Sequence, residues 1–390
     1  MSNSRTNEKK LEGSVRKPEC CPYCKGKTLV RRGIRSKKHE NIQIYFCKKC
    51  KKRITGQTLN GKAYPTPMIL EALSLYSLGF SLSEVAAKLE ALFGISVAKA
   101  TVHDWTTEFK GLCPFSRMRE EALKIYKPNQ MIEKVRLKHQ QTYDFMLHRG
   151  KLDLLLKTEQ NAKFESLKTL LTSVASECPH DLFREGGRAS KVGGVFSRDE
   201  LWVEQKDNFA VDTTKFVIQS IAKNTLRHQA IQKFMLLNDS VTVATEVPII
   251  MDQRDLNELR KLGFVIPESL QGPVTGHIDI LQIRNGGIHI LDYKPGAKAV
   301  DAVDQLTIYA LALSRLTGLR LFDFSCGWFD ETGYYDFWPL HVVHKPRSPK
   351  SYGRKSSNER SARVQGERHR VQEQRARRSR DSEDWDGWEW

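Results

Sequence analysis

The sequence predicts a multidomain protein with a small β domain, an all-α segment and an α/β core built on a mixed sheet. Three observations support this prediction. Two Cys-x-x-Cys pairs lie near the N-terminus, three segments of helical periodicity follow them, and the C-terminal half alternates between helix and strand patterns. A chain of 390 residues is long enough for two or three domains.

These patterns also suggest where each part of the chain begins and ends. In order, we expect a disordered basic arm over 1–17, a metal-binding β domain over 18–62, a helical domain over 66–112, a helical connector over 113–211, an α/β core over 212–340 and a disordered tail over 344–390.

The β domain is defined by four cysteines in two pairs separated by 22 residues. They are Cys21, Cys24, Cys47 and Cys50. Each pair can present two thiolates to one ion, so the two pairs complete a tetrahedral structural Zn²⁺ site. The strand-like segments TLVRRG and IQIYF lie between the pairs and predict the hairpin of a zinc ribbon. Cys20 in place of Cys21, or His39, stays open as an alternative ligand.

Residues 67–109 have the pattern of three short helices. Gly79 and Gly94 end the first two helices, and Ser81 or Ser83 caps the second. The segments GFSLSEVAAKL and GISVAKATVHDW resemble the helix-turn-helix of transposases and resolvases, whose third helix enters the major groove of DNA. A zinc ribbon before such helices is also similar to the start of insertion-sequence transposases. A three-helix interaction module without DNA is the alternative.

The helix-turn-helix resemblance implies which side chains face DNA and which pack inside. The DNA-facing residues would be Lys99, Thr101 and His103, with Asp104 beside them. The inward-facing residues would be Val85, Leu89, Val102 and Trp105.

Charge is distributed unevenly along the chain. Residues 1–66 carry a formal charge of +14, residues 67–340 carry −2 and residues 341–390 carry +5. Basic ends on a near-neutral body are typical of segments that hold DNA phosphates, although a basic surface also serves solubility. The tail nevertheless ends in DSEDWDGWEW, which is suited to a partner's basic groove or to competition with DNA on the protein itself.

The α/β core is predicted from a helix over 212–236, a strand over 241–250, a hairpin over 275–294, a helix over 301–316 and a strand over 319–330. Within the hairpin, Asp279 lies in one strand and Asp292 in the other, with a turn at 285–287 between them. Residues two apart share a strand face, so Asp292 and Lys294 project together. Two carboxylates are suitable ligands for Mg²⁺ or Mn²⁺. An adjacent lysine can stabilise the negative charge that develops in the transition state of phosphoryl transfer.

The segments GHIDIL, LDYKPG and QLTIYALAL, in this order, resemble the RecB-like branch of the PD-(D/E)XK nuclease superfamily. The resemblance implies a restriction-endonuclease-like core in which Asp279 and Asp292 bind metal and Lys294 is the catalytic lysine. It also implies supporting roles for Gln305 and Tyr309 on the following helix. Glu246, in VTVATEVPII, matches a further acidic ligand of the family. Pro295 departs from the family's usual threonine.

The connector over 113–211 carries no recognisable catalytic set. Helices are predicted in two of its segments, YKPNQMIEKVRLKHQQTYDFMLHRGKLDLLLK and AKFESLKTLLTSVASE. Three of its histidines follow no ligand spacing, and we expect them to be surface or packing residues. They are His139, His148 and His180.

Together these features predict a Mg²⁺- or Mn²⁺-dependent deoxyribonuclease that a zinc ribbon and a helix-turn-helix direct to DNA. The alternatives are a noncatalytic DNA-binding protein derived from a mobile element and a nuclease subunit that acts with a helicase or recombination partner. Cutting both strands with one active site per chain would suggest a homodimer. Since no apolar run approaches the roughly 20 residues of a membrane span, we expect an intracellular, cytoplasmic protein associated with the nucleoid and not with a membrane.

Overall fold

The computed structural model describes residues 11–12, 18, 20–55, 59, 62–198, 201–221 and 224–344. The tail predicted over 344–390 lies outside the described residues apart from His344, and so does most of the arm predicted over 1–17. Leu11–Glu12 is an exception, because it forms a short strand, β1, parallel to β3 (Glu40–Cys47). The prediction of disorder was wrong for these two residues, since the edge of β3 offers their backbone groups hydrogen-bond partners.

The N-terminal β domain is a small sheet centred on β3. β2 (Leu29–Ser36) and β4 (Arg53–Thr55) pair with β3 in antiparallel fashion. This arrangement confirms the hairpin expected between the cysteine pairs. Leu29, Tyr45 and Ile54 form its apolar core beside the cysteines.

Three helices follow, close to the predicted positions: α1 (Thr66–Ser77), α2 (Leu82–Phe93) and α3 (Lys99–Glu108). Ser81, and not Ser83, caps α2. The Ser81 hydroxyl accepts from the backbone of Glu84, while the Glu84 carboxylate accepts from the backbone of Ser81. Gly94 ends α2 with a φ of 67°, a conformation that glycine adopts readily.

A nine-stranded mixed sheet forms the centre of the larger α/β region. Its strands run in the spatial order β5 (Ile132–Lys138), β6 (Thr142–His148), β9 (Thr242–Met251), β10 (Val274–Arg284), β11 (Gly287–Tyr293), β12 (Phe324–Phe329), β13 (Tyr334–Phe337) and β8 (Glu204–Lys206). A short β7 (Gly187–Arg188) pairs with β10. The β11–β12 pair is parallel, whereas its neighbours are antiparallel, which makes the sheet mixed.

Strands β5 and β6 correct the prediction that residues 113–211 form a helical connector. The region does contain α4 (Arg119–Ile125), α5 (Arg149–Leu156), α6 (Glu165–Glu177) and α7 (Leu182–Glu185). Residues 132–148, however, form an antiparallel hairpin whose second strand pairs with β9. In β5, Leu137 is buried while Lys134, Arg136 and Lys138 are exposed. Burial thus alternates from one residue to the next, as in a strand, although the amino-acid composition of the segment favours a helix. Tertiary pairing with the sheet overrides the local propensity.

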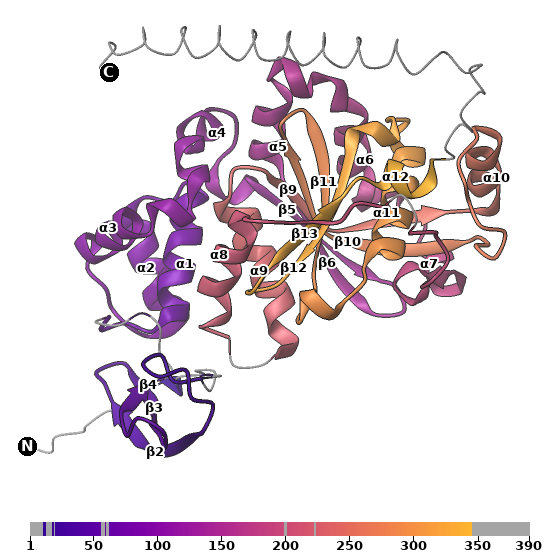
Figure 1. The fold of residues 1–390 in the computed structure, drawn as a ribbon. Helices are drawn as coiled ribbons and strands as arrows, with labels where there is room; N and C mark the ends of the chain where they lie inside the picture. The colour runs from indigo at the N-terminus through magenta and orange to yellow at the C-terminus, as the bar shows by residue number, and fades with distance from the viewer. Residues whose placement is uncertain are drawn as a thin grey trace, which may run out of the picture. The chain divides into compact units, whose positions relative to one another are not determined.

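Helices cover both faces of the large sheet (Figure 1). On one face, Leu281 and Ile290 pack into a core shared with α5, α6 and α11 (Val303–Thr317). On the opposite face, Ile280 and Leu291 pack with α8 (Phe209–Ile218) and α9 (Asn224–Asn238). The prediction of a single helix over 212–236 was wrong, because two helices, α8 and α9, lie in this region. Each of them packs apolar side chains against the sheet.

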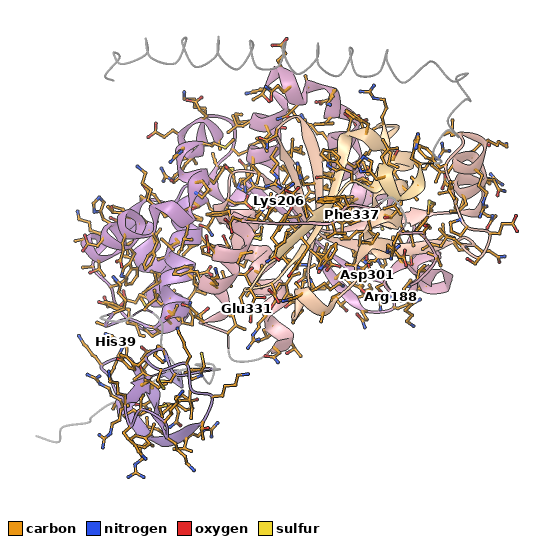
Figure 2. The ribbon with its side chains drawn as sticks, in the orientation of Figure 1. His39, Arg188, Lys206, Asp301, Glu331 and Phe337 are labelled. Atoms are coloured by element: carbon orange, nitrogen blue, oxygen red, sulfur yellow. The ribbon has the colours of Figure 1, made fainter. Side chains whose placement is uncertain are left out.

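The remaining elements lie at the margins of the sheet. α10 (Gln253–Lys261) follows β9 and precedes β10 in the chain, and α12 (Pro339–Val343) is the last helix of the described residues. Figure 2 labels Lys206, on the edge strand β8, and Phe337, on the neighbouring β13. Lys206 Nζ lies 3.3 Å from a carboxylate oxygen of Asp336 on β13. None of the helices in the described part of the chain combines the length and apolar character needed to cross a membrane.

Candidate active site and metal centres

The two aspartates of the predicted site lie where strands β10 and β11 separate. Their pairing runs from the Arg284–Gly287 turn to Ile280 and Leu291. Asp279 and Asp292 come next on each strand, and beyond them β10 continues beside β9 while β11 continues beside β12. Both carboxylates are nearly buried, with exposed fractions of 9% and 1%. The hairpin therefore holds two acidic groups together at an opening in the sheet.

Lys294 lies on the same side as Asp292, as the two-residue spacing predicted. Its Nζ is 2.8 Å from Asp292 Oδ2, whereas Tyr293 packs into the core on the α8–α9 face. Burial opposes protonation of Lys294, but the charge of Asp292 raises the pKa of the lysine above its usual value. The lysine is thus a cation held directly beside a buried carboxylate.

A third side chain of this cluster, His228, was not anticipated from the sequence. It lies on α9, and its Nε2 contacts Oδ2 of Asp279. Burial alone would lower the pKa of His228, yet the charge of Asp279 raises it to about 9. The same contact, against the effect of burial, holds the pKa of Asp279 at about 2. One ring nitrogen of His228 and one oxygen from each of Asp279 and Asp292 lie within 4.8 Å of one another.

The carboxylate of Asp292 provides a test of whether a cation fits this cluster. Among the described residues, neither of its oxygens makes a hydrogen bond of regular geometry, although the side chain is buried. Burial and the neighbouring charge of Asp279 raise the pKa of Asp292 well above its usual value. Buried charged groups normally require a partner, and Lys294 Nζ, 2.8 Å from Oδ2, is the partner of Asp292 among the described residues. A divalent cation on the histidine nitrogen and the two carboxylates would add a second positive charge between Asp279 and Asp292.

Glu246 lies opposite Asp279 in the antiparallel register, because its neighbours Thr245 and Val247 pair with Ile280 and Ile278. Its φ of 53° is in the left-handed region, which is costly for a residue other than glycine and typical of functional sites. Gln232 Nε2 donates to Glu246 Oε1 at 2.8 Å. Burial, followed by the charge of Asp279, raises the pKa of Glu246 to about 7. It therefore borders the cluster and can hold a proton near neutral pH.

Gln305 and Tyr309 lie on one side of α11, as their spacing of four predicted. Gln305 Nε2 donates to the Tyr309 hydroxyl at 2.9 Å. Burial, then the charges of Asp292 and Asp279, raise the pKa of Tyr309. Gln305 also lines a pocket of about 380 Å³ together with Arg198, Asp301 and other residues. The pair thus connects the carboxylate cluster with a neighbouring open pocket.

The four ribbon cysteines converge as predicted. Cys21 Sγ lies 3.5 Å from Cys50 Sγ, and Cys24 Sγ lies 3.6 Å from Cys47 Sγ. Tetrahedral zinc with Zn–S bonds of about 2.3 Å separates its sulfurs by roughly 3.8 Å. These four cysteines could hold a structural metal such as zinc, and neither Cys20 nor His39 belongs to the group.

The backbone explains why the two cysteine pairs match. Lys25 and Lys51 each follow the second cysteine of a pair and adopt φ values of 57° and 59°. The amide of Lys25 donates to the carbonyl of Cys21, and that of Lys51 donates to the carbonyl of Cys47. Two turns of equal geometry thus direct four thiols to one point.

The residues expected to contact DNA lie on the outer side of α3. Lys99 and His103 are exposed and Thr101 is partly exposed, whereas Val102 and Trp105 are buried. Val85 and Leu89 of α2 are also buried, as the pattern predicted.

The three-helix segment contacts the α/β region, because α1 packs on α9. At this contact Ser77 Oγ donates to Asn238 Oδ1 at 2.8 Å.

The connector histidines are packing or surface residues, as expected. The ring centroid of His148 lies 4.6 Å from that of Phe115, His139 is buried and stacks on Phe183, and His180 is exposed. The sequence did not predict that His139 and His180 also converge with Cys178, each offering a potential ligand atom within 4.8 Å of the others. Their chain separation of about 40 residues gave no spacing signal.

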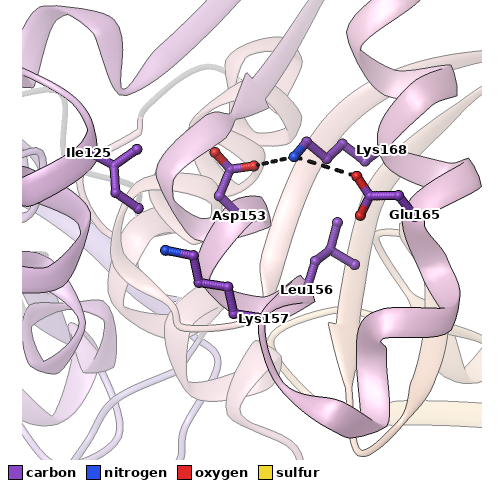
Figure 3. A pocket seen from close by; sticks show the side chains of 6 residues that line it. All are labelled: Ile125, Asp153, Leu156, Lys157, Glu165 and Lys168. Atoms are coloured by element: carbon purple, nitrogen blue, oxygen red, sulfur yellow. Dashed lines mark ion pairs between the residues drawn. The ribbon is translucent and has the colours of Figure 1, made fainter.

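A surface pocket of about 280 Å³ lies among Ile125, α5 and α6 (Figure 3). Lys168 Nζ lies 3.0 Å from Asp153 and 3.6 Å from Glu165. Tyr126 donates to the other oxygen of Asp153 at 2.7 Å. Of the four charged side chains that line this pocket, Asp153, Glu165 and Lys168 are therefore paired with one another. The carboxylate cluster is the stronger candidate for chemistry.

Comparisons with known proteins gave no match to a family model, to a curated protein or to a solved structure.

Proposed function

We propose that this protein is a metal-dependent deoxyribonuclease whose α/β region is a PD-(D/E)XK core. One observation carries the proposal. His228, Asp279 and Asp292 converge on one point at the opening between two strands, with Lys294 Nζ 2.8 Å from Asp292. A buried acidic pair, an imidazole and an ammonium group match the needs of phosphodiester hydrolysis.

Each residue has a distinct task in this proposal. Bound Mg²⁺ or Mn²⁺ would polarise the scissile phosphate and lower the pKa of a water molecule. Asp279, Asp292 and His228 are the residues that hold the cation. Lys294 orients the attacking water and stabilises the negative charge that develops on phosphate oxygens. Glu246, with a pKa of about 7, accepts or releases a proton at the edge of the site.

The fold supports the same assignment. A helix (α9) precedes three consecutive antiparallel strands, a second helix (α11) follows them, and β12 then returns parallel to β11. This order and the mixed sheet are those expected from the resemblance to restriction-endonuclease-like cores. The carboxylates lie at the end of the central hairpin, where strands β10 and β11 separate.

The N-terminal region would deliver DNA to this site. Residues 1–66 carry a formal charge of +14, and α3 exposes Lys99 and His103. Basic groups of this density bind phosphates with an affinity that falls steeply with salt. We propose DNA as the polymer because the helix order matches a helix-turn-helix.

Cleavage of labelled single-stranded, duplex and branched DNA with Mg²⁺, Mn²⁺ or EDTA tests the proposal. Asp292→Asn and Lys294→Ala should each lower the cleavage rate at least 100-fold, in the range seen for loss of one transition-state contact. DNA affinity, measured by fluorescence anisotropy, should change little. Lys298→Ala is the matched control, because Lys298 is an exposed lysine four residues further along.

The opposite result would be a native protein that binds DNA but cuts none of the substrates with either metal. The α/β region would then serve as a scaffold in a noncatalytic DNA-binding protein. Cleavage retained in both variants would equally remove the assigned residues from the mechanism.

A further inference from the structure

A second group of metal-ligating side chains lies on the far side of His277 from the carboxylate cluster. His139 follows β5, while Cys178 and His180 lie in the turn after α6. His139 Nε2 is 2.9 Å from His180 Nδ1 and 3.7 Å from Cys178 Sγ. His139 is buried, Cys178 is partly exposed and His180 is exposed.

The separations between these atoms can be compared with those in a metal site. With bonds of about 2.0 Å to nitrogen and about 2.3 Å to sulfur, tetrahedral zinc places two nitrogens roughly 3.3 Å apart and a nitrogen and a sulfur roughly 3.6 Å apart. The N–S separation agrees closely, and the N–N separation reaches its value after a shift of a few tenths of an ångström. Two of the three separations are therefore close to those of a metal site, and the third pair of atoms, on His180 and Cys178, lies within 4.8 Å.

Hydrogen bonding alone explains this convergence poorly. An imidazole nitrogen without a proton has one lone pair, in the plane of the ring. His180 Nδ1 and Cys178 Sγ both approach the same atom, His139 Nε2. Whether this nitrogen carries a proton or a lone pair, it can form one in-plane hydrogen bond, so only one of the two groups can be its partner. A cation at the centre would use all three groups.

The other nitrogen of His139 has the partner that a metal-bound histidine needs. His139 Nδ1 lies 2.8 Å from Nε2 of His277. A metal-binding histidine usually donates its second N–H to an acceptor, which fixes the ring and its tautomer. His277 is itself held by a stacked Tyr143, with ring centroids 3.6 Å apart. Phe183 stacks on His139 at 4.0 Å.

A metal at this site would bind the deprotonated thiolate of Cys178 and so displace the thiol proton.

We propose that His139, Cys178 and His180 form a second zinc-class metal site, separate from the ribbon and from the carboxylate cluster. Mixed thiolate and imidazole ligands select zinc-like ions over Mg²⁺, which prefers oxygen. The exposed side of the group, at His180, leaves the fourth position to water. The proposal does not depend on the nuclease assignment.

The position of the site indicates what it would do. A metal ion at this site would link the β5–β6 turn, which carries His139, to the turn after α6, which carries Cys178 and His180. The contact between His139 and His277 would connect both turns to β10. His277 lies two residues before Asp279, on the same side of β10. Metal at this site would therefore brace the strand that carries Asp279.

Zinc content of the full-length protein provides the test. Protein purified from zinc-supplemented medium should contain two zinc ions per chain, one in the ribbon and one at the proposed site. Cys178→Ser and His180→Ala should each contain one. The matched control His341→Ala, an exposed histidine on α12, should retain two. Circular dichroism and thermal unfolding establish that each variant is folded.

Cobalt substitution provides a second, independent measurement. Native protein loaded with Co²⁺ should show the absorption of a four-thiolate site plus a weaker contribution from a one-thiolate site, and Cys178→Ser should lose only the latter. One zinc ion per native chain, or unchanged zinc content in folded Cys178→Ser and His180→Ala, would overturn the proposal. The three side chains would then form a hydrogen-bonded packing cluster.

Discussion

A Cβ atom on Gly276 would collide with the ring of Tyr309. Gly276 lies on β10, three residues before Asp279, and Tyr309 lies on α11 beside Gln305. The missing side chain lets α11 approach the strand closely enough for Tyr309 to pack near the carboxylates. This contact gives a steric reason for glycine three residues before Asp279 in the sequence GHID.

Gly276→Ala should therefore destabilise the protein by about 1–3 kcal/mol, as overpacking in a close-packed core does. It should also slow DNA cleavage, because Tyr309 and Gln305 must move. Urea unfolding of the variant measures the first effect. Tyr309→Leu removes the colliding ring atoms. Gly276→Ala should therefore cost less stability when it is added to Tyr309→Leu than when it is made in the native protein.

Gly287→Ala is the control for this experiment. It lies in the same hairpin, and an added Cβ there would meet its nearest neighbour at 3.5 Å, an ordinary contact. Equal destabilisation by the two substitutions would show that the Tyr309 contact is not the cause.

His228→Gln tests the histidine that the sequence analysis missed. Removal of the imidazole takes away the positive partner of Asp279 and one proposed metal ligand. We expect cleavage to require at least tenfold more Mn²⁺ for half-maximal rate, a typical effect of losing metal-site support. His341→Gln is the matched control, and a metal dependence identical in the two variants would exclude His228 from the site.

Lys99→Ala should weaken DNA binding without changing the cleavage chemistry. Loss of one phosphate contact reduces the slope of log affinity against log salt concentration by about 1. Lys261→Ala removes the same charge from exposed Lys261 on α10 and serves as the control. Anisotropy titrations at several salt concentrations measure both slopes, and equal slopes would place α3 away from DNA.

His289 should make folding stability depend on pH. Burial, then the nearby charge of Arg284, lowers the pKa of His289 to about 3. The unfolded chain takes up a proton near pH 6.5, whereas the folded chain does not until the pH is much lower. Stability is therefore fully present above pH 6.5 and falls as the pH decreases toward 3, by at most about 1.4 kcal/mol per pH unit from this residue.

His289→Gln should reduce that acid loss, by about 1–2 kcal/mol between pH 6.5 and 5. The quantity to compare is the slope of unfolding free energy against pH, measured by urea denaturation at each pH. His341→Gln should keep the native slope because that histidine is exposed. An unchanged slope in His289→Gln would mean that His289 has a similar pKa in the folded and unfolded chains.

The sequence by itself determined the features that depend on nearby residues. Two Cys-x-x-Cys turns direct four thiols to one point, because each pair is shaped by its own backbone turn. The hairpin that brings Asp279 beside Asp292 follows from alternation around a tight turn, and Lys294 follows from a period of two. Ser81 and Gly94 mark the ends of α2 through local hydrogen bonding and backbone freedom.

Only the tertiary structure decided the features whose members come from distant segments. His228 reaches Asp279 across 51 residues because α9 packs against the sheet. His139 meets His180 because β5 and β6 join the sheet, a pairing hidden by a composition that favours helices. Local propensity and spacing carry no information about such contacts. They form because burying apolar surface on both faces of the sheet brings these elements, and the polar side chains they carry, to the same place.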